Sequence, residues 1–376
     1  MTQRGSTTAM LSFREHISAV SGMDEFDEEA VRAKIHLVDG DVLMLSGSLV
    51  DGSGTPSSDF DFSVFAPTRD ERFHRDTFPR EGHMRYYTSG DRVKASFDYL
   101  PHSLLGVDVE YWTVQEITHM LTAHAQLYEH MRSRARKSSS FAASAVDFRL
   151  LSRLTYGVPL TNVPEFERIT AGLRPGELAY TAFRTAVGSY PDFRDLAGMW
   201  AQKDYESALI AARKLGVDTF RGLTHVHGNT NRNPKYLARF LARLPVSLSE
   251  LTTRFRHLNA YGVPSAAEAP DAVLEWLDLI DAAFGEIRQA RDAAEAFVGR
   301  QGFLDLLKHE LHETMGWNAE ISNEYCFRAR EATGDVPPLR ELLSAMEARD
   351  AVEHRLPLQQ WALRRRAPAG ENNTSV

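Results

Sequence analysis

Two short apolar runs stand close together early in the chain, separated by a polar stretch rich in glycine and serine. Residues 42–50 read VLMLSGSLV, residues 51–59 read DGSGTPSSD, and residues 60–66 read FDFSVFA. Apolar runs of this length, bounded by turn-forming residues, are typical of buried strands. The pattern therefore predicts a strand, a loop or short helix, and a second strand over residues 42–67.

Further strands are predicted downstream of this pair. Residues 84–88 and 92–100 flank the turn signal SGD, and apolar and polar residues alternate in the second arm. Alternation on both sides of such a turn predicts a β-hairpin. Residues 104–112, LLGVDVEYW, predict one more strand.

From residue 113 onward the pattern changes to the helical period. Thr113 and Glu116 have the spacing of a capping box, which predicts a helix that begins at this point. Trp276 and Phe284 belong to an apolar stripe that is expected to lie in a core. The same period predicts two helices before the strands, over residues 9–20 and 28–37. After the strands it predicts helices over residues 114–131, 176–186, 204–215, 234–244, 272–284 and 301–315.

The change of pattern near Trp112 predicts a domain boundary. Residues 1–112 are expected to form a mixed α/β unit, and residues 113–366 an all-helical domain. The last ten residues, 367–376, read APAGENNTSV and are expected to be a disordered tail. The fold class predicted is therefore α+β.

Composition adds limits on the location and partners of the protein. The chain has 376 residues, with 43% hydrophobic and 25% charged residues, enough for two domains with sizeable cores. No stretch approaches the roughly 18 apolar residues of a membrane helix, and the N-terminus lacks the features of a secretory signal. Cys326 is the single cysteine, which fits a reducing cytoplasm. A formal charge of −8 argues against a polynucleotide partner, and the sequence carries no signal for an oligomeric state.

The second apolar run carries a pair of carboxylates. Asp59 and Asp61 are two residues apart, so in a strand they project from one face while Phe60 and Phe62 point into a core. Two parallel carboxylates repel each other unless a cation neutralises them. Hard divalent cations with oxygen ligands, Mg²⁺ above all, suit such a pair.

A third carboxylate is available on the strand predicted over 104–112. Asp108 and Glu110 are also two apart and are expected to face Asp59 and Asp61. Three convergent carboxylates with two Mg²⁺ ions suit in-line phosphoryl or nucleotidyl transfer. A Gly/Ser/Asp-rich loop between strands is also common without any such function.

The run Gly47-Ser48 … Ser58-Asp59-Phe60-Asp61, followed by Val107-Asp108-Val109, resembles the signature of DNA polymerase β-like nucleotidyltransferases. Closest in kind are the small-molecule members, similar to aminoglycoside nucleotidyltransferases with a C-terminal helical domain. The resemblance covers residues 42–112 and is loose afterwards. It implies a nucleotidyltransferase core, a short mixed sheet with flanking helices, in residues 1–112, and a helical substrate-binding domain in residues 113–366.

The resemblance also implies roles for individual residues. Asp59 and Asp61 would bind two Mg²⁺ ions, and Asp108 would bind the catalytic ion and help to activate the acceptor. Gly47 and Ser48 would hold the phosphates of a nucleoside triphosphate through backbone N–H groups and a hydroxyl. Glu110 could be a base, a substrate contact, or a neighbour that orients Asp61 through a cationic group.

A second stretch, HGNTNRNPKY over residues 227–236, predicts a helix start with Asn233 as N-cap and Pro234 as first residue. Lys235 then lies in the first turn, where the helix dipole disfavours a cation. A bound triphosphate would resolve that conflict, and related nucleotidyltransferases place a lysine beside an aromatic residue, similar to Lys235-Tyr236. The alternative is a lysine that extends into solvent.

The sequence thus predicts an enzyme that transfers NMP, with ATP as the expected donor, to a hydroxyl or phosphate of a small acceptor and releases pyrophosphate. Two alternatives stay open. One is synthesis of a nucleotide signal or oligonucleotide, or nucleotidylation of a protein or tRNA. The other is a non-catalytic nucleotide-binding protein on the same fold.

Overall fold

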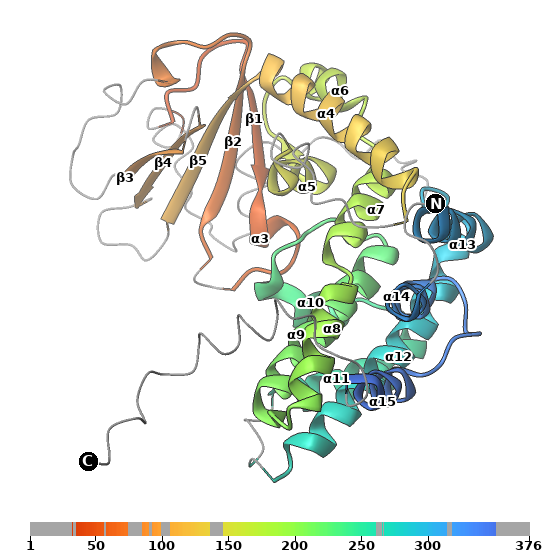
Figure 1. Cartoon of the computed structure of the whole chain (residues 1–376). Helices are drawn as coiled ribbons and strands as arrows, with labels where there is room; N and C mark the ends of the chain where they lie inside the picture. Colours follow the sequence, from red (N-terminus) through yellow and green to blue (C-terminus); the bar gives the residue numbers. More distant parts are fainter. Residues whose placement is uncertain are drawn as a thin grey trace, which may run out of the picture. The chain divides into compact units, whose positions relative to one another are not determined.

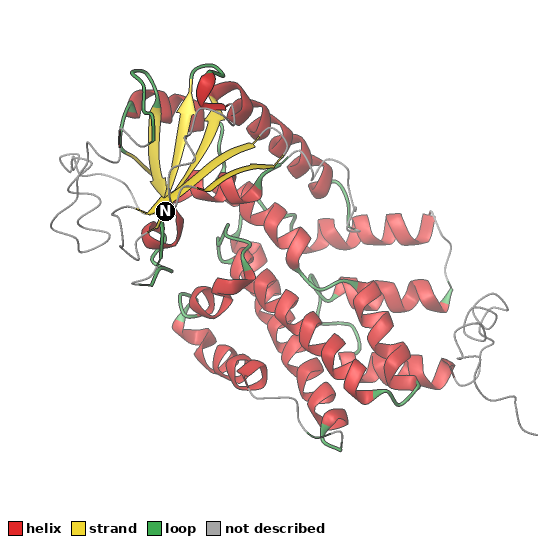
Figure 2. Cartoon of the chain, turned by 90° about the vertical axis from the view of Figure 1, so that its left-hand side faces the viewer, coloured by secondary structure: helices red, strands yellow, loops and turns green. Residues whose placement is uncertain are grey.

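The computed structural model describes residues 32, 35–55, 58–73, 85–89, 92–98, 106–135, 146–260, 265, 267–313 and 318–350. Helix 9–20 and the tail 367–376, both predicted, lie outside these residues, as does most of the predicted helix 28–37. The described part is α+β (Figure 2). The chain divides into two compact units. The first comprises Met1–Met131, Ser138–Ala182 and Gly228–Arg239, and the second comprises Arg132–Lys137, Phe183–His227 and Phe240–Val376.

The first unit is built on a mixed sheet, which confirms the predicted strands (Figure 1). The strands are β1 Val42–Ser46, β2 Phe60–Ala66, β3 Arg85–Ser89, β4 Arg92–Asp98, β5 Gly106–Thr113 and β6 Val158–Pro159, in the order β3-β4-β5-β2-β1-β6. Strands β2 and β5 are parallel, and every other neighbouring pair is antiparallel. The arms β3 and β4 pair as the predicted hairpin.

Strand β6 is a correction to the sequence analysis, which placed no strand after residue 112. Its two residues pair with β1 through Val158–Leu45 and Pro159–Met44. So short a strand carries no detectable period, and proline is tolerated there because β6 forms the edge of the sheet.

The apolar face of the sheet is the core of the first unit. Phe60 and Phe62 are fully buried, as predicted, and Val107 and Val109 pack into the same cluster. Alternation along β2 and β5 then leaves Asp61 and Asp108 on the opposite face. The sequence period therefore sets which face carries the acidic side chains.

Helices flank this sheet in the first unit. They are α3 Gly47–Val50, α4 Val114–Arg132, α5 Phe148–Tyr156, α6 Val163–Thr170 and most of α7 Pro175–Ala186, with a 3₁₀ turn η1 at Glu71–Phe73. Helix α4 begins with the predicted capping box. The Thr113 N–H donates to Glu116 Oε2 at 2.6 Å, and the Glu116 N–H donates back to Thr113 Oγ1 at 3.1 Å.

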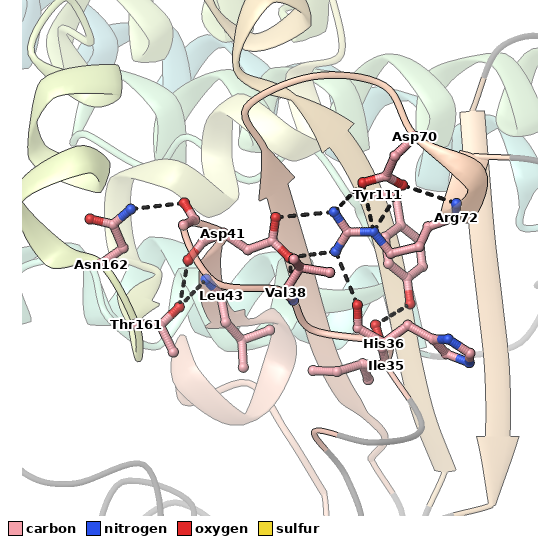
Figure 3. A network of polar contacts seen from close by, with 11 residues as sticks. Ile35, His36, Val38, Asp41, Leu43, Asp70, Arg72, Tyr111, Thr161 and Asn162 are labelled. Atoms are coloured by element: carbon pink, nitrogen blue, oxygen red, sulfur yellow. Dashed lines mark hydrogen bonds and ion pairs between the residues drawn. The ribbon is translucent and has the colours of Figure 1, made fainter.

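A buried arginine fastens the turn before β1 to the loop after β2 (Figure 3). Arg72 in η1 binds both oxygens of Asp41, with 3.1 Å between Nη2 and Oδ1, and also contacts Asp70. Its Nη1 donates to the carbonyl of His36 at 3.1 Å. The side chains of Arg72 and Asp41 are 4% and 1% exposed. Arg72 therefore compensates the buried charge of Asp41, while Asp70 and Asp41 together compensate that of Arg72.

The described residues of the second unit form helices joined by turns and loops, with no strand among them. It contains α8 Tyr190–Ala201, α9 Tyr205–Val226, α11 Ser249–Ala260, α12 Ala269–Ala293, α13 Arg300–Lys308, a π-helical turn His309–Glu313, α14 Ala319–Ala329 and α15 Leu339–Asp350. Helix α10 Leu237–Leu241 follows a 3₁₀ turn η3 at Pro234–Tyr236 and crosses from the first unit to the second. A further 3₁₀ turn, η4 at Val246–Leu248, precedes α11.

Helices α9 and α12 lie side by side and form the centre of the second unit (Figure 1). Trp276 and Phe284 are buried, as predicted. Helix α9 extends beyond the predicted range 204–215 and continues through Gly216. A β-carbon at Gly216 would lie 2.4 Å from the Trp276 ring, so the lack of a side chain there lets the ring pack against the helix. Close packing therefore outweighs the low helix propensity of glycine at this position.

Membrane-spanning helices are absent from the part of the chain that the structure describes, because none of its helices combines the length and the apolar character that a span requires.

The first unit extends past residue 112, since α4, α5 and residues 228–239 belong to it. The functional division at that residue, between a catalytic and a substrate-binding domain, stays a prediction.

Candidate active site on the sheet

Asp61 and Asp108 are direct neighbours on the two parallel strands β2 and β5. They occupy the same register position, and Glu110 follows two residues later on β5. Parallel strands in register place such side chains on one face of the sheet. Both Asp108 and Glu110 act electrostatically on Asp61. The structure thus brings three of the four predicted carboxylates together.

Gly47 forms the turn that lies against this group. Strand β1 ends at Ser46, whose register partner is Asp61. Gly47 has a φ of 82°, a conformation that favours glycine. A β-carbon at this position would come within 2.0 Å of Asp61 Oδ2. Glycine is therefore required both by the backbone and by the carboxylate packed on it.

Ser48 lies half-buried in α3, directly after Gly47. Helix α3 is a single turn of four residues, so few peptide dipoles are aligned along it. Any phosphate binding at Gly47 and Ser48 would depend on individual backbone N–H groups and the hydroxyl, rather than on a helix macrodipole.

Asp59 lies one residue before β2 and is exposed. Its carboxylate packs against Gly106 at the start of β5, where a β-carbon would come within 2.5 Å of Oδ1. Asp59 and Asp61 are thus next to different glycines, on two sides of β2.

Two arginines of α5 pair with the carboxylates, and sequence reasoning missed both of them. Arg153 donates to Asp61 Oδ1 at 2.7 Å and lies 3.8 Å from Glu110 Oε1. Arg149 lies 2.6 Å from Glu110 Oε1 and donates to Oε2 at 2.9 Å. The available signal was Asp147, which caps α5 by accepting from the N–H groups of Arg149 and Leu150. A helix beginning there puts positions 149, 153 and 156 on one face.

Burial governs the electrostatics of this group. It raises the pKa of Asp61 above its usual value, Arg153 opposes that rise, and Asp108 adds to it. Burial alone would lower the pKa of the Arg153 guanidinium, but Asp61 and Glu110 raise it overall. The site is therefore held together by mutual compensation of charge.

Tyr156 completes the side of α5 that faces the site. Burial raises the pKa of its phenol, and the nearby charges of Asp51 and Asp61 raise it further. A backbone hydrogen bond with Gly47 acts in the opposite direction. The phenol therefore stays protonated next to the glycine turn.

The segment after α9 joins the same unit through the loop that follows α3. Asn231 Nδ2 donates to Asp51 Oδ2 at 3.2 Å, and Arg239 Nη1 donates to the carbonyl of Gly54 at 2.8 Å. The predicted N-cap is confirmed, because Asn233 Oδ1 accepts from the Lys235 N–H at 3.0 Å.

Lys235 is exposed, and its Nζ lies 5.3 Å from the centre of the Tyr236 ring. The helix predicted over 234–244 is shorter than expected. It consists of η3 and the five residues of α10.

The oxygen-rich group of Asp61 and Asp108 suits Mg²⁺ by its chemistry. The carboxylates of Asp61 and Asp59 occupy the places that a β-carbon on Gly47 or Gly106 would need. Within the described residues, no set of three or more His, Cys, Asp or Glu side chains is arranged to hold a metal ion. Arg153 supplies positive charge to Asp61 instead. The residues therefore fit a divalent cation if Arg153 gives up its contact.

Comparison with known proteins adds no relative. No family model matches the sequence, and no curated protein matches it.

Proposed function

We propose that this protein is a metal-dependent nucleotidyltransferase, which transfers NMP from a nucleoside triphosphate, with ATP as the expected donor, to a hydroxyl or phosphate of a small molecule. The observation that carries this proposal is the register of Asp61 and Asp108 on parallel strands, beside the glycine turn at Gly47. Convergent carboxylates next to a glycine turn suit the triphosphate donor of such a reaction.

In this proposal Asp61 and Asp108 hold Mg²⁺, and Asp59 adds a further carboxylate as the resemblance implies. Bound Mg²⁺ would supply Lewis-acid stabilisation of the charge on the transferring and leaving phosphates. Gly47 and Ser48 bind the phosphates through backbone N–H groups and a hydroxyl. Asp108 orients the acceptor hydroxyl and accepts its proton as the oxygen bonds to the α-phosphorus. The bond from the α-phosphorus to the α–β bridging oxygen breaks, and pyrophosphate leaves.

Lys235 and Tyr236 are proposed to contact the triphosphate. Their segment lies in the unit that carries the sheet, and Asn231 and Arg239 fasten it to the loop after Gly47 and Ser48. The exposure of Lys235 leaves its ammonium accessible to an anion.

The acidic balance of the chain favours a small or cationic acceptor over a polynucleotide.

Pyrophosphate release measured with Mg²⁺ and each of the four common nucleoside triphosphates tests the proposal. Each triphosphate is supplied alone and with a panel of aminoglycosides and other small acceptors. Release with at least one triphosphate is expected, and Asp61→Asn and Asp108→Asn should each lower it by about 10³-fold or more. Asp335→Asn makes the same chemical change at an exposed aspartate and should leave the rate unchanged.

Mass spectrometry of the products separates the alternatives. A nucleotidylated small molecule supports the proposal, whereas a nucleotide product formed without an acceptor indicates signal synthesis. Release that survives Asp61→Asn would exclude this site as the catalytic centre.

A second candidate function is nucleotide binding without catalysis. It is favoured by the pairing of Asp61 and Glu110 with Arg153 and Arg149, which already balances much of the acidic charge. Calorimetric binding of a nucleoside triphosphate, together with no pyrophosphate release under any of the conditions above, would support it over the enzyme.

A further inference from the structure

We propose that Arg153 competes with the divalent cation for Asp61, and that it binds the polyphosphate of the donor once the cation has displaced it. This inference rests on the proposed function. It makes Arg153 a substrate-binding residue that couples the binding of cation and polyphosphate.

The geometry places Arg153 where a cation would have to bind. Its Nη2 lies 2.7 Å from Asp61 Oδ1, and its Nη1 lies 3.8 Å from Glu110 Oε1. The side chains of Arg153 and Asp61 are 11% and 16% exposed, so water screens their attraction weakly. A cation that binds Asp61 therefore meets a fixed positive charge at contact distance.

Glu110 does not depend on Arg153 alone. Arg149 forms the shorter contact with Glu110, at 2.6 Å, and is 47% exposed, whereas Glu110 is 6% exposed. If Arg153 moves away, Glu110 keeps a partner, while Asp61 needs a new one. The two arginines of α5 thus have different roles, and the release of Arg153 frees Asp61 in particular.

A displaced Arg153 needs an anion, because a partly buried guanidinium without one is costly. A polyphosphate fits that need, since guanidinium binds phosphate oxygens through parallel N–H donors. Tyr156, one turn further along α5, already contacts the backbone of Gly47, so this face of α5 borders the proposed phosphate site. Cation and polyphosphate should then favour each other's binding, as linkage requires.

Two separate binding measurements test the proposal at about pH 8, well above the ordinary carboxylate range. Mn²⁺ alone is titrated by electron paramagnetic resonance, and inorganic tripolyphosphate is titrated by calorimetry at saturating Mg²⁺, the condition in which Arg153 is released from Asp61. The proteins are the wild type, Arg153→Gln, Arg153→Lys and Arg168→Gln. Arg168 forms an exposed ion pair with Glu165 on α6 and controls for the loss of one positive charge. Asp61→Asn identifies the Mn²⁺ site, because it should abolish binding there.

Arg153→Gln should bind Mn²⁺ about 10-fold more tightly and tripolyphosphate about 10-fold more weakly than the wild type, each being about 1.4 kcal/mol. Arg153→Lys keeps the charge and should lie between the two proteins in both titrations. Arg168→Gln should match the wild type. A purely structural arginine would weaken both ligands when it is replaced, so opposite changes are the distinguishing result.

Unchanged or weaker Mn²⁺ binding in Arg153→Gln overturns the inference, as does failure of both wild type and Arg153→Gln to bind Mn²⁺. If Arg153→Gln does not fold, Arg153→Lys decides by the same criterion, and Mn²⁺ affinity no tighter than that of the wild type overturns the inference. Failure of the proposed function is a separate result. In that case Arg153→Gln still changes the two affinities in opposite directions, but the protein releases no pyrophosphate. If the protein releases pyrophosphate and Arg153→Gln leaves Mn²⁺ binding unchanged, only the role of Arg153 is overturned.

Discussion

Gly47 and Asp61 are in such close contact that a β-carbon on residue 47 would lie 2.0 Å from Asp61 Oδ2. The carboxylate is thereby held between the turn after β1 and the guanidinium of Arg153. Its position depends on the lack of a side chain at residue 47 as much as on its own strand.

Gly47→Ala is expected to reduce both stability and activity. The φ of 82° is strained for alanine by about 1–2 kcal/mol, and the added methyl group displaces Asp61. Thermal unfolding and pyrophosphate release measure the two effects. Gly198→Ala in α8 is the matched control, because no atom lies within 4 Å of a β-carbon there. It should stabilise the protein by up to about 1 kcal/mol, and a Gly47→Ala protein as stable and active as the wild type would contradict the assigned contact.

Removal of the buried guanidinium of Arg72 should strongly destabilise the first unit. Arg72→Met leaves Asp41 buried without its cation, and we expect a loss of about 3–5 kcal/mol. Arg72→Met combined with Asp41→Asn should recover part of that loss, since the uncompensated charge is gone. Arg168→Gln, which breaks an exposed ion pair, should leave stability close to that of the wild type, because water screens such pairs. Denaturation by urea gives the free energies, and equal losses for the single and double variants would argue against charge burial as the cause.

His124 should make stability depend on pH in the acidic range. Burial lowers the pKa of this histidine to about 4, and its Nε2 lies 3.0 Å from Thr181 Oγ1. Because the unfolded chain binds the proton more readily, the contribution is fully present above about pH 6.5. It is lost as the pH falls towards 4 and amounts to about 3 kcal/mol. In His124→Gln the slope of unfolding free energy against pH should flatten over this range, and an unchanged slope would show that other groups cause it.

The capping box should contribute measurably to α4. Thr113→Ala removes the acceptor of the Glu116 N–H and should cost about 1 kcal/mol. Glu116→Gln keeps an acceptor for the Thr113 N–H and should cost less. Thermal unfolding of the three proteins checks the order, and a larger loss for Glu116→Gln would mean that its ion pair with Arg69 matters more than the cap.

The sequence predicted those parts of the fold whose signals are local. The alternation of Phe60 and Phe62 with polar neighbours placed β2 and its buried face, and the spacing of Thr113 and Glu116 placed the start of α4. Each signal is contained within a few residues, so a single sequence displays it. The hairpin of β3 and β4 was found for the same reason.

The rest depends on contacts between distant parts of the chain. Arg153 and Asp61 are 92 positions apart. The Asp147 cap indicates where α5 begins, but it does not indicate which strand the helix packs on. Asn231 reaches Asp51 over 180 positions, which is why the unit that contains Lys235 could not be foreseen. The two residues of β6 form a strand only because β1 has a free edge to pair with.

The unit that carries the sheet is composed of three separate stretches of sequence, the last of them Gly228–Arg239. The segment Phe183–His227 lies between the second and third stretches in the sequence and belongs to the other unit. On the ribosome, β1 and β2 can therefore pair early, but the loop that includes Asp51 and Gly54 must wait until residue 239 has emerged. A nascent chain stalled before that point would present the acidic face of the sheet with its loop unfastened, so assembly of the proposed donor site would be a late event of synthesis.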